Sequence, residues 1–241
     1  MQMMRDRPCP DPVVGGMNIT APIITTIALA LVAATPAAAS VNRDLPKPDD
    51  PQFVIPAGKV EHSITVSEVS GSKAVPSRQR AELWLSRNRG RVVVTNLKTG
   101  RVTTEIVVTK HDTRMFSAET GRITVRKTRR GEGLPWNSAR FEAAVQRAYV
   151  EQGITKVTGE TTVRGRRAFV VESVPGKWVS DEPGSKTVAV VDAETYELYE
   201  RTSTYPGGEF TQTETTQTSY GAPARFNMSA HKGAKVRYVN R

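Results

Sequence analysis

The residues best suited to chemistry are three histidines, His62, His111 and His231, which lie far apart in the sequence. No two have the spacing of ligands to one metal ion, and none stands in a motif that pairs it with a nucleophilic serine. Isolated histidines of this kind are ordinarily solvated residues on strands. The sequence therefore predicts no metal site, no catalytic residue, no cofactor and no enzymatic activity.

Two short motifs resemble those of serine β-lactamases. Residues 70–73 match Ser-x-x-Lys, and residues 98–100 match Lys-Thr-Gly. In those enzymes the serine opens a helix, and the two motifs lie far apart with a third between them. Here Ser70 lies in a Gly/Ser-rich turn and Lys98 in a hairpin turn, so we interpret both motifs as turns.

Basic residues form two runs. Four lysines and arginines fall within residues 126–130, and three arginines fall within residues 164–167. Cationic side chains on exposed strands protect a sheet against edge-to-edge aggregation. The same charges would also suit anionic lipid headgroups or cell-wall polyanions. Both interpretations are open, whereas the export signal described next argues against nucleic acid as a partner.

The N-terminal 39 residues have the pattern of a secretory signal peptide. Residues 19–34 carry no charge and are followed by Ala37, Ala38 and Ala39, an Ala-x-Ala cleavage site. Threonines and prolines make this run too weak for a membrane-spanning helix, which needs about 20 apolar residues. We expect cleavage after Ala39 and a soluble extracytoplasmic protein, periplasmic or secreted. Translation could start at Met1 or at Met17.

The mature chain has the composition of one globular domain. Residues 40–241 keep the net charge of +10 and contain no cysteine, because the single Cys9 lies in the signal peptide. Disulfides and thiolate chemistry are therefore excluded. About 200 residues correspond to a single domain. Four prolines make residues 40–58 an N-terminal leader without a helix, so residues 59–241 form the domain.

Short strands dominate that domain. β-branched residues alternate with other types, and turn residues recur at close intervals. Glycines at residues 100 and 121 fit tight antiparallel hairpins. We predict about eleven strands, with a further short one near residues 235–239. The eleven are residues 59–69, 80–88, 91–97, 101–110, 113–118, 122–127, 154–163, 167–174, 186–192, 196–205 and 209–220.

One segment has the pattern of a helix. Phe141, Val145, Ala148 and Tyr149 recur at spacings of three and four, Ser138 is a good N-cap, and Gly153 suits the C-terminal cap. The sequence thus predicts a single amphipathic helix over about residues 138–152, between two series of strands.

The order of these elements resembles the LolA/RseB-type lipoprotein-carrier superfamily. The segments VTGETTVRGRRAFVVE (residues 157–172) and KTVAVVDAETYELYERTS (residues 186–203) carry the likeness. Val157, Gly159, Gly165, Arg166, Ala168 and Phe169 follow one family signature, and Asp192, Thr195 and Leu198 follow another. The resemblance covers about residues 59–219. It implies a mainly β (α+β) fold, an antiparallel unclosed half-barrel with the central helix as its lid.

The resemblance also implies two functions. One is a non-catalytic carrier that holds a lipid or lipoprotein acyl chain in the half-barrel. The other is an envelope sensor of the RseB type that binds a membrane protein partner. A carrier needs a continuous apolar lining, whereas an interaction module needs an exposed edge strand, for which the Thr-rich residues 211–219 would qualify.

Strand alternation suggests where a hydrophobic ligand would bind. Trp84, Val93 and Val107 each stand between two apolar neighbours, so both faces of their strands are apolar and both must be covered. One helix cannot cover both faces of so wide a sheet. We therefore predict a ligand-binding surface lined by Trp84, Val93 and Val107, together with Val171 and Tyr199 from the second half of the domain.

Overall fold

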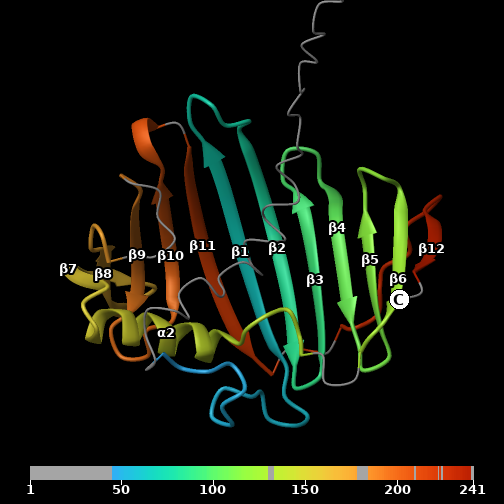
Figure 1. The fold of residues 1–241 in the computed structure, drawn as a ribbon, viewed down its shortest axis with the longest axis horizontal. Coiled ribbons are helices and arrows are strands. Elements are labelled where there is room, and N and C mark those ends of the chain that lie inside the picture. Colours follow the sequence, from blue (N-terminus) through green and yellow to red (C-terminus); the bar gives the residue numbers. More distant parts are fainter. Residues whose placement is uncertain are drawn as a thin grey trace, which may run out of the picture.

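The computed structural model describes residues 45–129, 133–177, 184–208, 210–221, 223 and 225–239. The expected signal peptide lies outside these residues. The described residues form twelve strands, one α-helix and a 3-10 turn (Figure 1). Their bounds are β1 Glu61–Ser70, β2 Ser77–Ser86, β3 Arg89–Asn96, β4 Arg101–Val108, β5 Asp112–Ser117, β6 Arg122–Lys127, α2 Ala139–Glu151, β7 Thr155–Val163, β8 Arg166–Ser173, β9 Lys186–Asp192, β10 Leu198–Thr204, η2 Pro206–Gly208, β11 Thr211–Tyr220 and β12 Lys235–Val239.

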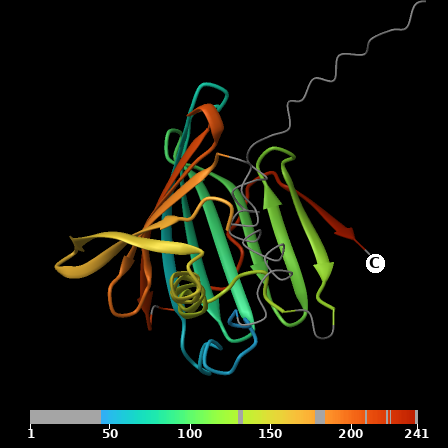
Figure 2. The same ribbon diagram turned by 60° about the vertical axis from the view of Figure 1, so that its left-hand side comes forward.

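All twelve strands belong to one sheet, whose order is β12-β6-β5-β4-β3-β2-β1-β11-β10-β9-β8-β7. Every neighbouring pair is antiparallel except β12 and β6, which run parallel. The sheet bends without closing, and α2 crosses one of its faces (Figure 2). The predicted mainly β half-barrel with a single helix is confirmed.

One strand lies where the sequence did not place it. The Thr-rich strand β11 pairs with β1 on one side and with β10 on the other, so it is an interior strand and not an exposed edge. The edges of the sheet are β7 and β12. The prediction failed because threonines suit any half-buried strand and do not identify an edge.

The predicted hairpin turns form as expected. Gly100 and Gly121 have φ angles of 67° and 60°, which are readily adopted only by glycine. They connect β3 to β4 and β5 to β6. Local turn chemistry therefore builds the antiparallel series β1 to β6.

Helix α2, Ala139–Glu151, begins and ends within one residue of the predicted bounds, residues 138 and 152. The Ser138 side chain accepts a hydrogen bond from the Phe141 N–H, and Gly153 has a φ of 64° just beyond the C-terminus. The Ser138 hydroxyl also donates to the Phe53 carbonyl at 2.9 Å, and the rings of Phe53 and Phe141 meet edge to face. The leader thus holds the start of the helix.

The main hydrophobic core lies on the face of the sheet that α2 covers, which we call the helix-side face. Side chains from β2, β3 and β4 pack there against Ile55 of the leader and Trp136, which precedes the helix. The buried members are Ile55, Ala81, Leu83, Leu85, Val92, Val94, Val108 and Trp136. A smaller cluster of Val171, Ala189 and Val191 packs against Val150 of α2.

Candidate functional site

Three of the five residues predicted to bind ligand share the opposite face of the sheet, the outer face. Trp84 pairs with Arg91, and Arg91 pairs with Val107, so Trp84, Arg91 and Val107 form a row across β2, β3 and β4. Trp84 is 5% exposed and Val107 is 2% exposed, while Val93 is half-buried. His62 stacks on one side of this row, with 4.7 Å between its ring centroid and that of Trp84.

A C-terminal segment, residues 225–234, lies against this outer face. Glu105 is fully buried and accepts hydrogen bonds from Arg91 Nε at 2.8 Å and from the Ser229 N–H at 2.9 Å. Its other carboxylate oxygen lies 2.8 Å from His231 Nε2, and His231 stacks on Phe116. The chain itself therefore covers the face on which the sequence predicted a ligand.

Charge around Glu105 holds it ionised. Burial alone would raise the pKa of Glu105, but the Ser229 N–H, the Arg91 guanidinium and His231 outweigh it and lower the pKa below its usual value. The carboxylate thus joins the C-terminal segment to β3 and β4.

The other two predicted residues lie elsewhere. Val171 is 2% exposed on the helix-side face, in the cluster beneath α2. The Tyr199 hydroxyl donates to Asp192 Oδ2 at 2.7 Å beside a bulge in β10. Burial opposes ionisation of Asp192, yet hydrogen bonds from Tyr199, Thr195 and Glu194 lower its pKa to about 2. The five residues therefore do not come together in one site.

Between the two hydrophobic clusters, the helix-side face is lined mainly by polar side chains, with the buried Val69 of β1 as an apolar exception. The polar side chains come from β1, β2, β8, β9, β10 and β11, which register places side by side. We call this surface the polar strip. Its members are Ser63, Thr65, Ser67, Ser77, Gln79, Ser173, Thr187, Arg201, Ser203, Gln212, Glu214, Thr216 and Thr218.

The polar strip has an ion pair at its centre. Arg201 donates to Glu214, and Gln212 Nε2 donates to the same carboxylate at 2.9 Å. Threonine and serine hydroxyls pair across the strands, with Thr65 and Thr216 at 3.2 Å and Thr187 and Ser203 at 3.2 Å. The middle of the half-barrel is therefore a hydrogen-bonding surface.

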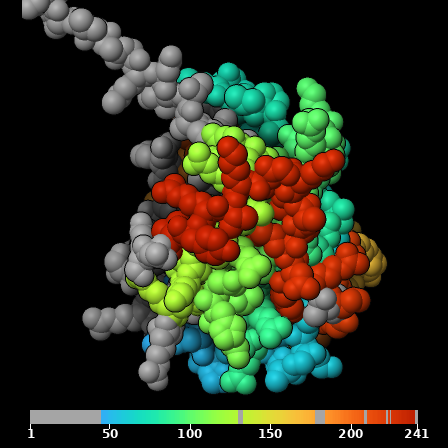
Figure 3. All heavy atoms as spheres, turned by 90° about the vertical axis from the view of Figure 1, so that its right-hand side faces the viewer, coloured from blue at the N-terminus to red at the C-terminus, as the bar shows by residue number. Residues whose placement is uncertain are grey.

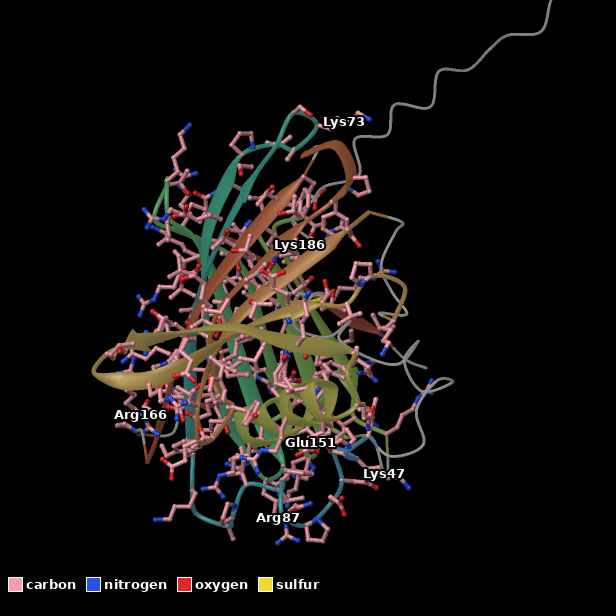
Figure 4. All side chains as sticks on the ribbon, turned by 90° about the vertical axis from the view of Figure 1, so that its left-hand side faces the viewer. Lys47, Lys73, Arg87, Glu151, Arg166 and Lys186 are labelled. Carbon is pink, nitrogen blue, oxygen red and sulfur yellow. The ribbon has the colours of Figure 1, made fainter. Side chains whose placement is uncertain are left out.

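Some polar atoms of the strip have no partner. Ser77 Oγ and Gln79 Oε1 are buried, and neither forms a hydrogen bond within the part of the chain that the structure describes. Figure 4 shows Lys73 and Lys186, which are close in sequence to Ser77 and Thr187 of the strip, toward one end of the strands. Glu151 of α2 lies toward the other end. The end of the strip near Ser77 and Thr187 therefore lies away from the helix.

The strip was not predicted as a site, although the sequence carries a signal for it. Hydroxyl residues occupy alternate positions 63, 65 and 67 of β1, and polar residues fill nearly all of β11. A strand with period-two hydroxyls turns one polar face in a single direction. What the sequence does not show is that these two strands are neighbours.

Potential metal ligands and the two short motifs are the remaining candidates for chemistry among the described residues. No three His, Cys, Asp or Glu side chains there could hold a metal ion. Lys98 lies in the β3–β4 turn, as the sequence predicted, whereas Ser70 is the last residue of β1 and not part of the turn that follows it. No helix among the described residues is both long and apolar enough to cross a bilayer.

Comparison with known proteins gives likeness in fold. No family model matches the chain, and no curated protein matches its sequence. The Pseudomonas aeruginosa MucA/MucB complex matches with a TM-score of 0.43 and 18% identity, over 76% of this chain and 59% of that chain. Lipoprotein LppX of Mycobacterium tuberculosis matches with a TM-score of 0.40 and 9% identity, over 82% of this chain and 98% of that chain.

A LolA superfamily protein from Nitrosomonas europaea also matches, with a TM-score of 0.31 and 8% identity over 73% of this chain and 93% of that chain. The type of protein named by the sequence resemblance is thus found again among solved structures. Identities this low concern the fold alone, so no binding residue is carried over from these proteins.

Proposed function

We propose that this protein is a non-catalytic, exported interaction module that binds a polypeptide segment along the polar strip. This is the sensor type of function, which the family resemblance implied as the alternative to an acyl-chain carrier. The observation that carries the proposal is the lining of the helix-side face, which is mainly polar between its two hydrophobic clusters.

The unpartnered atoms of the strip favour a ligand that forms hydrogen bonds. A buried polar group without a partner costs about 1–3 kcal/mol. Both atoms are buried in the fold, so a ligand would reach them only by displacing the groups that cover them. A polypeptide that did so offers a backbone N–H that could donate to Gln79 Oε1 and a carbonyl that could accept from the Ser77 hydroxyl. An acyl chain offers neither group, so its binding would leave that cost in place.

The test compares two probes on the same protein. A displayed peptide library should yield peptides that bind the mature protein, whereas a fluorescent fatty acid should not bind. Gln79→Leu should weaken the selected peptides by roughly tenfold, because it removes one buried acceptor worth about 1–1.5 kcal/mol. Gln217→Leu is the matched control, since Gln217 is exposed on the outer face of β11.

The acyl-chain carrier is the second candidate. It is favoured by the apolar cluster of Val171, Ala189 and Val191 beneath α2, next to Val157, which is 42% exposed on the edge strand β7. Fatty-acid binding that Val171→Asp abolishes in a folded protein, together with no peptide selection, would favour the carrier over our proposal.

A further inference from the structure

Positive charge is concentrated along one edge of the sheet, at β5, β6 and β12. Residues 109–129 and 231–239 build β5, β6, β12 and their turns, which we call the basic edge. It holds nine lysines and arginines but only two acidic residues, Asp112 and Glu119. Asp112 is already paired with Arg114 at 2.8 Å. The cations are Lys110, Arg114, Arg122, Arg126, Lys127, Arg129, Lys232, Lys235 and Arg237.

The chain brings these charges together from distant segments. β12 pairs with β6 in parallel, which places Lys235 beside Arg122 and Arg237 beside Thr124. Arg122, Lys127, Lys235 and Arg237 are exposed, and no carboxylate of the described residues forms an ion pair with any of the four. Figure 3, which faces this edge, shows C-terminal atoms (red) over those of the preceding strands. Like charges held this close favour an anionic partner.

Apolar side chains accompany the cations on the same strand. Tyr238 is 75% exposed and Val236 is 54% exposed, and β12 is the outermost strand. Tyrosine concentrates at the headgroup level of bilayers, and lysine and arginine stems lie along apolar surface while their charges reach phosphates. Val236 and Tyr238 point to the opposite face of β12 from Lys235 and Arg237, so a partner must meet the edge of the sheet to contact both sets. A soluble polyanion would account for the cations alone, whereas a bilayer that meets this edge accounts for the cations and for the exposed Tyr238 and Val236.

We propose that the basic edge docks the protein onto an anionic lipid bilayer, with Tyr238 and Val236 in the interfacial layer and the β6 and β12 cations on lipid phosphates. The inference is independent of the polar strip, because the two surfaces share no residue.

Vesicle co-sedimentation of the mature protein tests the proposal. Binding to phosphatidylcholine vesicles that contain phosphatidylglycerol should exceed binding to pure phosphatidylcholine and should fall as salt is raised. Each cation near such a surface contributes roughly a fivefold factor. Replacing Arg122, Lys127, Lys235 and Arg237 by Gln should therefore lower binding by about 600-fold.

A control with the same change in net charge separates local from global electrostatics. Lys59, Arg87, Lys98 and Arg101 are exposed outside the basic edge, and their replacement by Gln should lower binding by less than about tenfold. Equal losses in the two quadruple variants, or equal binding to neutral and anionic vesicles, would overturn the proposal.

The apolar contribution is tested with Tyr238→Ser. This variant should bind anionic vesicles several-fold more weakly than the wild type, while its binding to dextran sulfate is unchanged. If Tyr238→Ser binds both anionic vesicles and dextran sulfate as well as the wild type does, the basic edge is a polyanion site and not a bilayer site. Because Tyr238 is mostly exposed, thermal unfolding should show the same stability for this variant and the wild type.

Discussion

Glu61 is a carboxyl group buried at the start of α2. It is 1% exposed, its Oε1 accepts the Ala139 N–H at 2.9 Å, and its Oε2 has no partner among the described residues. Burial, reinforced by the nearby Glu197 and Glu142, raises the pKa of Glu61 to about 7. The folded protein therefore keeps this group protonated at a pH where the unfolded chain has ionised it.

The sign of the pH dependence follows from this raised pKa. The stability due to protonated Glu61 is complete below the unfolded pKa of about 4.5 and is lost as the pH rises through the folded pKa of about 7. Glu61→Gln keeps the acceptor for Ala139 and has no charge to bury. We expect it to be more stable than the wild type at pH 8, by on the order of 2–3 kcal/mol.

Urea unfolding at pH 5 and pH 8 checks this prediction. The advantage of Glu61→Gln should appear at pH 8 and should be small at pH 5. Glu68→Gln, in the same strand but with its side chain 57% exposed, should show no such dependence. A stability difference that is independent of pH would contradict the assigned role of Glu61.

Strand β3 and the segment before α2 fit together because residue 90 has no side chain. A Cβ on Gly90 would lie 2.5 Å from Trp136 Cζ3 and 2.6 Å from Trp136 Cε3, closer than any normal contact. Gly90→Ala should destabilise the protein by about 1–3 kcal/mol through overpacking. Gly159→Ala in β7 is the control, since its nearest neighbour would be at 4.0 Å. Equal effects of the two substitutions on thermal unfolding would rule out this close packing.

The sequence predicted the individual hairpins and the helix well. The β3–β4 and β5–β6 hairpins and α2 depend on local chemistry, namely a glycine with positive φ at residues 100 and 121 and a serine cap at residue 138. Such signals require no knowledge of distant residues. The leader, residues 45–58, likewise forms no helix, as its prolines predicted.

In the whole molecule, the long-range contacts could not be predicted. The pairing of β1 with β11 and of β6 with β12 depends on registers that no local residue pattern encodes. Apolar side chains on both faces of the strand around Val93 correctly indicated that both faces are covered. We interpreted one of these covers as a bound ligand. The chain provides much of that cover itself, with Ile55 and Trp136 on one face and residues 225–234 on the other.

The contact between Glu105 and residues 225–234 joins the end of the chain to the middle of the sheet. Glu105 accepts from Arg91 and Ser229 and lies against His231, and the Arg91 side chain is only 12% exposed. Glu105→Gln leaves the buried Arg91 without a counter-charge, so we expect a loss of about 3 kcal/mol in unfolding free energy. Because the pKa of Glu105 is lowered in the fold, this stabilisation is present above the unfolded pKa of about 4.5 and is lost as the pH falls through the lower, folded value.

Hydrogen exchange locates the effect of Glu105→Gln within the molecule. Amides of residues 225–234 should exchange faster in the variant at neutral pH, and the wild type should approach the same behaviour in acid. Glu82→Gln is the matched control, because Glu82 lies on the same face but its side chain is 25% exposed and it pairs with His62 and Arg80 instead. Unchanged protection of residues 225–234 in Glu105→Gln would show that the C-terminal segment is held by its apolar contacts, above all the stacking of His231 on Phe116, and not by the buried carboxylate.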